Sequence, residues 1–309
     1  MRPGRRKRDD TAQWASAEQQ QYDAVAREAS AMVIRTYSSS FGLASRLLKE
    51  PVRSRIRDVY AFVRLADEIV DGPIGVSQPH RAAAALDRLE AETAEGLVDG
   101  YSPNLVVHAF VGTARRCQIG DDLIAPFLRS MRADLTVMEH DDASFVDYVY
   151  GSAEVVGLMC LRVFMLDDSA GTSATASRPT PQDLAGLETG ARRLGAAFQK
   201  VNFLRDLGED FNERGRRYFP GVDPTALTEA DKHRILDDID ADLDASRESM
   251  AALPRSSRVA VTAAHSLFDE LSRRLRATPA SAIVQQRVRV PTSVKNRVAM
   301  VSVVRGLAP

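Results

Sequence analysis

Two pairs of aspartates, each spaced four residues apart, are the strongest chemical signal in the sequence. In the segment RDVYAFVRLADEIVD (57–71), a helix would bring Tyr60, Arg64, Asp67 and Asp71 into a wedge of ~60°. The face beside this wedge is almost entirely aliphatic and aromatic, which predicts a largely buried helix. Two aspartates at the edge of such a helix need a partner that offsets their charge.

A second polar stripe lies in the segment FQKVNFLRDLGED (198–210). Gln199, Asn202, Asp206 and Asp210 share a wedge of ~80° if this segment is one helix. Apolar residues, two of them phenylalanines, flank the stripe on both sides. A solvated face would be wide and would lie opposite the apolar face. The narrow stripe therefore indicates a surface that faces a cavity.

A divalent cation is the partner that suits these carboxylates. Like charges at this spacing repel each other, and burying them without partners costs several kcal/mol per ion. Oxygen ligands without a histidine favour Mg²⁺, with Mn²⁺ as the alternative, and argue against zinc. Arg64 and Arg205 lie in or beside the stripes and could bind phosphate oxygens. Together the stripes predict a magnesium–diphosphate site, although a single DxxxD also occurs by chance on acidic helices.

The composition narrows the classes of partner. Among 309 residues, 41 basic side chains offset 42 acidic ones, so no overall basic field points to nucleic acid. A glycine-rich phosphate loop is absent, which argues against a nucleotide site. Cys117 and Cys160 form no CxxC pair, and the longest uninterrupted apolar run, Val155–Cys160, is far shorter than the ~20 residues of a membrane span. With no secretory leader visible, we expect a cytoplasmic protein.

The remaining pattern predicts an all-α protein. Residues 1–21 are polar and rich in arginine, and we expect them to form a disordered tail. Residues 22–309 have helical periodicity, interrupted by expected loops at 72–80, 99–103, 167–181 and 218–224, and we expect a single domain. The basic tail could also attract an anionic lipid surface, at ~1 kcal/mol per basic residue, which would give peripheral membrane contact.

The sequence around both stripes resembles the squalene/phytoene synthase family. The segments YAFVRLADEIVD and QKVNFLRDLGEDFNERGRRYFP are similar to the family's two aspartate-rich signatures. Three further segments resemble the family in the same order: SSSFGLASRLL (38–48), YVYGSAEVVGLMCLRVF (148–164) and RVRVPTSVKNRVA (287–299). The resemblance implies an isoprenoid synthase helical bundle with a deep central cavity. It also implies that two prenyl diphosphates are joined head to head through a cyclopropylcarbinyl diphosphate.

The resemblance assigns expected roles to particular residues. The first Mg²⁺ pair would be Asp67 and Asp71, and the second cluster Asn202, Asp206 and Asp210. Positions that bind diphosphate or orient the substrate would be Tyr60, Arg64, Gln199 and Arg205, and positions that contact substrate would be Ser38, Ser40 and Phe41. Tyr148 matches an active-site tyrosine, so the expected catalytic residues are Tyr60, Arg64, Tyr148 and Arg205. The sequence departs from the family at Glu154, where many members have glycine, and at His265, where many have tyrosine. The departure at His265 leaves no family role to carry over to it directly, and a histidine on a helix surface is the alternative interpretation.

The central segment offers candidate walls for a prenyl chain. On a regular helix, Tyr148, Ser152, Val155 and Met159 share one face, while Gly151 and Gly157 would leave room for the chain. Phe41, Tyr60 and Phe203 offer ring faces to a carbocation. Ordinary core packing is the alternative interpretation of these residues.

The expected reaction is the condensation of two geranylgeranyl diphosphates to phytoene, because the segment GSAEVVGLMCLRVF resembles bacterial phytoene synthases most. This reaction would need Mg²⁺ and no NADPH. One alternative is squalene or dehydrosqualene synthesis from farnesyl diphosphate. Others are a terpene cyclase, a head-to-tail prenyltransferase and a non-catalytic helical assembly module. The sequence identifies no final base, and released diphosphate is a candidate. It also predicts no oligomeric state.

Overall fold

The computed structural model describes residues 6–38, 40–166 and 180–307, and these form an all-α bundle. Within these ranges the only β-type pairing is an isolated bridge between Glu139 and Arg217. The helices are α1 (Arg6–Tyr37), α2 (Ser40–Ser45), α3 (Val52–Asp71), α4 (Pro73–Ser77), α5 (Pro79–Asp99), α6 (Leu105–Cys117), α7 (Asp121–Ala133), α8 (Asp142–Val149), the π-helical turn η1 (Tyr150–Glu154), α9 (Val155–Met165), α10 (Pro181–Arg205), α11 (Leu207–Arg214), α12 (Glu229–Ser249), the 3₁₀ turn η3 (Met250–Ala252), α13 (Arg255–Ala277), α14 (Ala280–Gln285) and α15 (Thr292–Leu307).

Local sequence explains where several of these helices begin and end. Asn104 caps α6 by accepting hydrogen bonds from the amides of Val106 and Val107. Capping boxes begin α8 at Asp141 and α10 at Thr180. At the end of α5, Gly100 takes the left-handed conformation (φ 78°), which glycine adopts without steric cost.

Two large apolar clusters build the body of the molecule. The first lies around α3, α5, α6, α7 and α9, and Phe62 and Phe110 stack at its centre with ring centroids 3.9 Å apart. The second lies around α10, α12, α13 and α14, and it includes Tyr148 and Phe203. The first aspartate pair is on a helix of the first cluster, and the second pair is on helices of the second cluster. A site that uses both pairs must therefore lie at the seam between the clusters.

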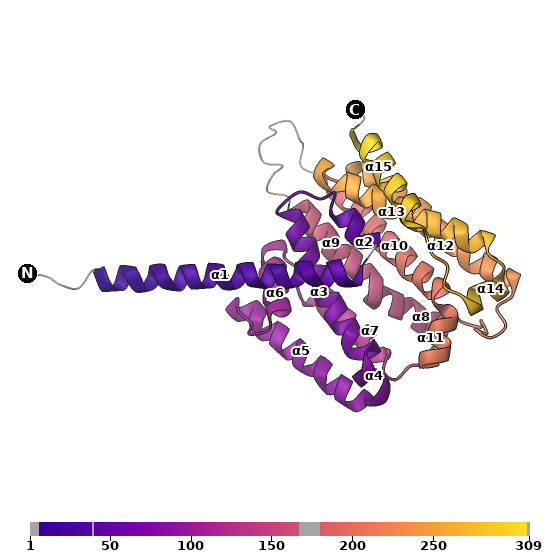
Figure 1. The fold of residues 1–309 in the computed structure, drawn as a ribbon, viewed down its shortest axis with the longest axis horizontal. Helices are drawn as coiled ribbons and strands as arrows, with labels where there is room; N and C mark the ends of the chain where they lie inside the picture. The colour runs from indigo at the N-terminus through magenta and orange to yellow at the C-terminus, as the bar shows by residue number, and fades with distance from the viewer. Residues whose placement is uncertain (1–5, 39, 167–179, 308–309) are drawn as a thin grey trace, which may run out of the picture.

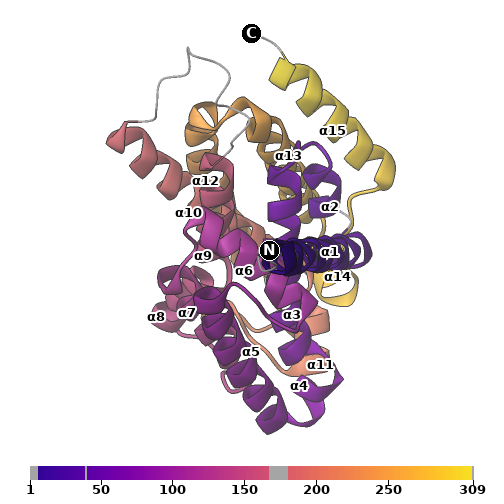
Figure 2. The ribbon, with the colours of Figure 1, turned by 90° about the vertical axis from the view of Figure 1, so that its left-hand side faces the viewer.

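The N-terminal segment differs from the expected disordered tail. Residues 6–21 belong to α1, so the helix is 32 residues long and extends well beyond the body of the molecule (Figure 1). Figure 2 views this helix end-on. Glutamine, alanine and arginine, which favour helix, are frequent there. The helix meets the body where Tyr22 donates a hydrogen bond to the carbonyl oxygen of Ser102.

Two further expectations about elements need correction. The expected loop at 72–80 contains the short helix α4, which follows α3 after Gly72. Within the described ranges, one stretch, Asp142–Met165, is long and apolar enough to span a membrane. This stretch joins α8, η1 and α9, and half of its most apolar window is buried against the rest of the fold.

Candidate active site

The structure brings the two aspartate stripes together at the end of α3. Arg214 lies between them, with Nη1 3.1 Å from Asp210 Oδ1 and Nε 3.7 Å from Asp71 Oδ1. Arg216 Nη1 donates a hydrogen bond to Asp71 Oδ1, at 2.7 Å. In both ribbon views α11, which carries Asp210, lies beside α4 and the end of α3 (Figures 1 and 2). The acidic edges therefore face each other across a pair of arginines.

The sequence predicted one helix for the second stripe, but the structure has two. The α-helix α10 ends at Arg205, and α11 begins at Leu207. The i to i−4 hydrogen bonds nevertheless continue, from the amide of Asp206 to Asn202 and from that of Asp210 to Asp206. Asn202, Asp206 and Asp210 therefore keep their common face through the bend. Gly208 permits the close contact with α14, because a Cβ there would lie 2.0 Å from the carbonyl oxygen of Val284.

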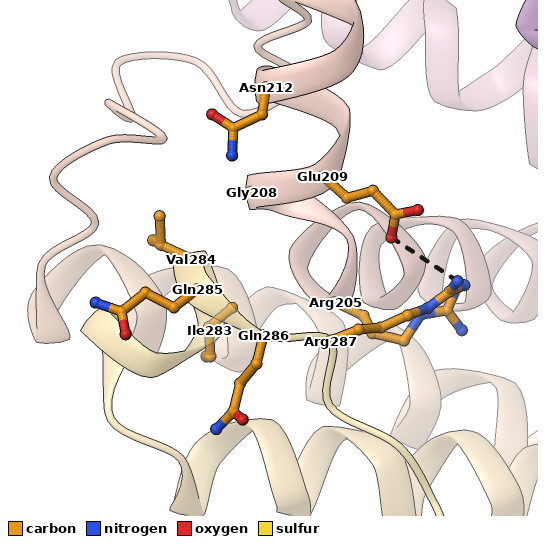
Figure 3. A pocket seen from close by; sticks show the side chains of 9 residues that line it. All are labelled: Arg205, Gly208, Glu209, Asn212, Ile283, Val284, Gln285, Gln286 and Arg287. Carbon is orange, nitrogen blue, oxygen red and sulfur yellow. Dashed lines mark ion pairs between the residues drawn. The ribbon is translucent and has the colours of Figure 1, made fainter.

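Asp206 is held by two arginines that come from different parts of the chain. Arg205 Nε lies 2.8 Å from Asp206 Oδ1, and Arg287 Nε lies 2.8 Å from the same oxygen. Arg205 and Arg287 also line a pocket of about 190 Å³ between α11 and α14 (Figure 3). Glu209 closes one side of this pocket, 3.9 Å from Arg287. The pocket is smaller than the ~300 Å³ at which pockets for drug-sized ligands begin.

The charges of the stripes perturb one another. Burial, together with the neighbouring charge of Asp71, raises the pKa of Asp67 to about 7. Burial and the charge of Asp206 raise the pKa of Asp210 to about 6. Both shifts mean that the ionised carboxylates are disfavoured here, by burial first and by neighbouring negative charge second, even with arginines present. Bound cations would favour the ionised forms.

The oxygen ligands of the two stripes suit Mg²⁺, and in this structure arginine side chains lie between the carboxylates. Asp67, Asp71, Asp206 and Asp210 offer carboxylate oxygens, and Asn202 offers an amide oxygen, all ligands that Mg²⁺ prefers. In the described part of the chain, no three acidic, histidine or cysteine side chains converge on one point. For Asp71 and Asp210 to bind the metal, the Arg214 side chain would have to move away from both carboxylates.

The expected substrate-contacting residues gather beside the middle of α3, around Tyr60. Phe41 stacks on Tyr60, with ring centroids 5.6 Å apart, and Ser38 accepts a hydrogen bond from the amide of Gly42. Arg64 lies over the Tyr37 ring at 4.4 Å and donates to Glu68 Oε2 at 2.5 Å. Ser40 begins α2, and its side chain lies outside the described part of the structure. Gln199 and Asn202 are partly exposed on α10.

Tyr148 is buried at the seam and belongs to a stack of aromatic rings. Its ring lies 5.9 Å from Phe203, 5.8 Å from Tyr218 and 4.8 Å from His140, measured between centroids. Phe203 and Tyr218 are themselves stacked at 3.9 Å. This places one of the expected catalytic residues and one of the expected aromatic walls in the same stack.

The two glycines expected to leave room for a prenyl chain instead allow helices to pack closely. A Cβ on Gly151 would lie 2.1 Å from Ser130 Oγ and 2.4 Å from the Pro126 carbonyl oxygen, both on α7. A Cβ on Gly157 would lie 2.3 Å from the carbonyl oxygen of Ala191 on α10. The expectation of a cavity at these glycines was therefore wrong. Val155 and Met159 are fully buried in the first apolar cluster, which agrees with core packing.

Both departures from the family pattern have structural partners. Glu154 forms an ion pair with Arg192 of α10, at 2.6 Å. His265 is buried, and its Nε2 donates a hydrogen bond to the carbonyl oxygen of Leu243 at 2.9 Å, because a carbonyl can only accept. It is therefore not the surface histidine that was the alternative. It joins α13 to α12 instead.

Sequence reasoning missed several residues of the site. Arg214, Arg216 and Tyr218 lie in the segment RGRRYFP directly after the second stripe, and a basic run beside an acidic stripe was a usable signal. Arg287 stands in another segment that resembles the family, yet only the fold reveals its contact with Asp206. Asp134 follows α7 as a single carboxylate in unremarkable sequence, so no spacing pattern could have identified it.

The comparisons agree with this geometry. The profile of the family described as squalene/phytoene synthase matches residues 34–294. The chain belongs to the squalene/phytoene synthase family. Phytoene synthase 3 of Zea mays is 33% identical over 207 residues, which are 64% of this chain and 44% of the maize protein. Phytoene synthase of Arthrospira platensis is 32% identical over 199 residues, or 63% of this chain and 62% of that protein. The matched regions thus span only part of these relatives.

Solved structures of the family share the fold. A dehydrosqualene synthase superposes with a TM-score of 0.75 at 22% identity, over 94% of this chain and 98% of that chain. The squalene synthase from Alicyclobacillus acidocaldarius superposes with a TM-score of 0.66 at 19% identity, over 82% of this chain and 95% of that chain. The expected isoprenoid synthase bundle is therefore confirmed.

Proposed function

We propose that this protein is a Mg²⁺-dependent head-to-head prenyltransferase that condenses two geranylgeranyl diphosphates to phytoene. The observation that carries the proposal is the meeting of two acidic stripes, from α3 and from α10–α11, with arginines between them. Relatives that are named phytoene synthases, at 32–33% identity, support the C40 product.

The proposed mechanism begins with the departure of diphosphate from an allylic carbon. Asp67 and Asp71 on one side, with Asn202, Asp206 and Asp210 on the other, would hold the metal. When bound, Mg²⁺ supplies Lewis-acid stabilisation of the charge that develops on the leaving group. Arg64 and Arg205 add fixed positive charge, and Arg214 becomes free to bind phosphate oxygens once its carboxylates are taken.

The chain must then protect an allylic cation from water. The stacked rings of Phe41 and Tyr60, and those of Tyr148 and Phe203, present π-faces worth ~0.5–2 kcal/mol each to a nearby cation. Their apolar surroundings also exclude solvent, so the cation reacts with the second prenyl chain. The seam between the two apolar clusters is where both chains would lie.

Hydrocarbon analysis tests this proposal directly. The purified protein is incubated with Mg²⁺ and either geranylgeranyl or farnesyl diphosphate, with and without NADPH, and the product mass is measured. We expect a C40 hydrocarbon from geranylgeranyl diphosphate without NADPH. A C30 product only would indicate the second candidate, squalene or dehydrosqualene synthesis, which the fold match to a dehydrosqualene synthase also suits.

Two variants test the metal assignment within the same assay. Asp67→Asn and Asp206→Asn should retain the helical circular dichroism of the parent protein and lose hydrocarbon formation. Asp122→Asn is a matched control, because Asp122 is exposed at the start of α7 and forms its ion pair with Arg162 of α9. Unchanged turnover in Asp67→Asn or Asp206→Asn would contradict the proposed role of the stripes.

A further inference from the structure

Asp134 and Tyr148 form a buried pair that no motif predicted. The Tyr148 hydroxyl donates a hydrogen bond of 2.6 Å to Asp134 Oδ1. Asp134 is 7% exposed and Tyr148 is 5% exposed, so water does not compete with this bond. The two residues come from opposite clusters, because Asp134 follows α7 and Tyr148 lies on α8, packed with α10.

Arg216 contacts Asp134 both at its backbone carbonyl oxygen and at its carboxylate. Its Nη2 donates to the Asp134 carbonyl oxygen at 3.0 Å, and its Nη1 lies 3.6 Å from Asp134 Oδ1. The same Nη1 donates to Asp71 at 2.7 Å. A continuous polar chain therefore runs from the Tyr148 hydroxyl through Asp134 and Arg216 to the first aspartate stripe.

We propose that Asp134 is a positioning residue for Tyr148: it accepts the phenolic hydrogen bond and so turns the lone pairs of the phenol oxygen toward the reacting prenyl chain. This inference rests on the proposed function. Burial raises the pKa of Asp134 to about 7, and Arg216 Nη1, 3.6 Å from the same carboxylate oxygen, opposes that rise. In the ionised form Asp134 can only accept, so the tyrosine is the donor.

The direction of this bond defines what Tyr148 can do. A phenol that donates its proton to a carboxylate has an electron-rich oxygen and ring, and it can accept from or lie against a cation. It is not free to donate that proton to the substrate. Tyr148 therefore stabilises the allylic cation electrostatically, and Asp134 acts through it without touching the substrate.

Loss of this positioning has a chemical signature. Capture of the allylic cation by water forms a carbon–oxygen bond, releases a proton and gives a prenyl alcohol in place of the hydrocarbon. A less well-stabilised cation forms more slowly, because the transition state that leads to it is higher in energy, and once formed it is captured more readily by water. We therefore expect both a lower kcat and a larger share of prenyl alcohol when Asp134 cannot accept the bond as a carboxylate.

A double-mutant cycle tests the proposal. The variants are Asp134→Asn, Tyr148→Phe and the double variant, with Asp122→Asn as the control. We expect Asp134→Asn to lower kcat by ~10- to 100-fold, with KM for geranylgeranyl diphosphate changed by less than about two-fold. The double variant should be no slower than Tyr148→Phe alone, because Asp134 acts only through the phenol. Affinity for inorganic diphosphate with Mg²⁺ should match that of the parent protein.

Three results would overturn the inference. They are an unchanged kcat and product ratio in Asp134→Asn, a double variant whose losses multiply, or a KM increase and a fall in melting temperature that account for the whole effect. Asp71→Asn separates this outcome from failure of the proposed function. If Asp71→Asn is inactive while Asp134→Asn behaves as the parent, only the positioning role fails. If the parent protein makes no hydrocarbon, the proposed function and this inference fall together.

Discussion

The aspartates of this site share the same spacing in the sequence but have different surroundings in the structure. Asp67 is half-buried beside Asp71 and has a raised pKa, whereas Asp71 itself is held by Arg216 and approached by Arg214. The sequence could show that these residues share a helix face. It could not show which of them is paired, because the arginines follow the second stripe by several residues and reach the first only after folding.

The raised pKa values predict a pH-dependent affinity for Mg²⁺. The pKa of Asp67 is about 7 and that of Asp210 about 6 in the metal-free protein, so protons compete with metal below pH 7. We expect the Mg²⁺ affinity to fall roughly ten-fold or more between pH 8 and pH 6. Calorimetric titration of the protein with Mg²⁺ at both values measures this effect.

Asp67→Asn provides the control for this pH effect. The variant lacks the group with the higher pKa, so its remaining Mg²⁺ affinity should vary less between pH 8 and pH 6 than that of the parent. An equal pH dependence in the variant would show that another group is responsible.

At the scale of elements, helix content was predictable and helix register was not. The periodicity of residues 22–309 predicted the all-α class, and the positions of both stripes on helices are confirmed. The prediction that Tyr148 and Met159 share one helical face was wrong. A π-helical turn at Tyr150–Glu154 adds one residue to that turn, so the residues before and after it lie on different faces. Such a turn depends on contacts with α7 and α10, which no local pattern reveals.

Close packing at Gly151 predicts a large stability cost for a single methyl group. Gly151→Ala would bring a Cβ within 2.4 Å of the Pro126 backbone, which cannot move aside, so we expect a loss of ~1–3 kcal/mol in the free energy of unfolding. Gly112→Ala on α6 is the matched control, since a Cβ there meets nothing within 4 Å. It should gain ~0.5–1 kcal/mol from helix propensity. Chemical denaturation of both variants measures the difference, and equal stabilities would contradict the packing argument.

Asp58 predicts a pH-dependent stability that is independent of the site. It lies buried where α3 meets α6, and it accepts a hydrogen bond from Thr113 at 2.8 Å. Burial raises its pKa from 3.8 to about 7, so the folded state binds a proton that the unfolded state has already lost. Its contribution to stability is therefore full below pH 4 and is lost as pH rises to 7, on the order of 4 kcal/mol at most.

Asp58→Asn should remove that pH dependence. The amide keeps an acceptor for Thr113, and its nitrogen can donate to Ser30 Oγ, which lies close to this side chain. Melting temperatures between pH 5 and pH 8 should decline less in the variant than in the parent. Parallel curves for the two proteins would rule out Asp58 as the titrating group.

At the scale of the whole molecule, the site is the place where two apolar halves meet. Asp71 and Asp134 are attached to the first cluster, and Asp210 and Tyr148 to the second. The contacts across this seam near the site are mostly polar, and Arg214 and Arg216 supply many of them. Metal binding would replace part of this polar contact, so it should also change how firmly the halves are joined.

Arg214 makes that coupling measurable. Arg214→Gln leaves Asp71 and Asp210 facing each other without the guanidinium between them, so we expect the metal-free variant to be ~1–3 kcal/mol less stable than the parent. Added Mg²⁺ neutralises the same carboxylates and no longer has to displace an arginine. The rise in melting temperature on adding Mg²⁺ should therefore be larger in the variant than in the parent. Arg273→Gln is the control, because Arg273 is 65% exposed on α13 and pairs with Asp269 and Glu270 away from the seam. If the variant and the parent gain equally from Mg²⁺, Arg214 does not hold the place of the metal.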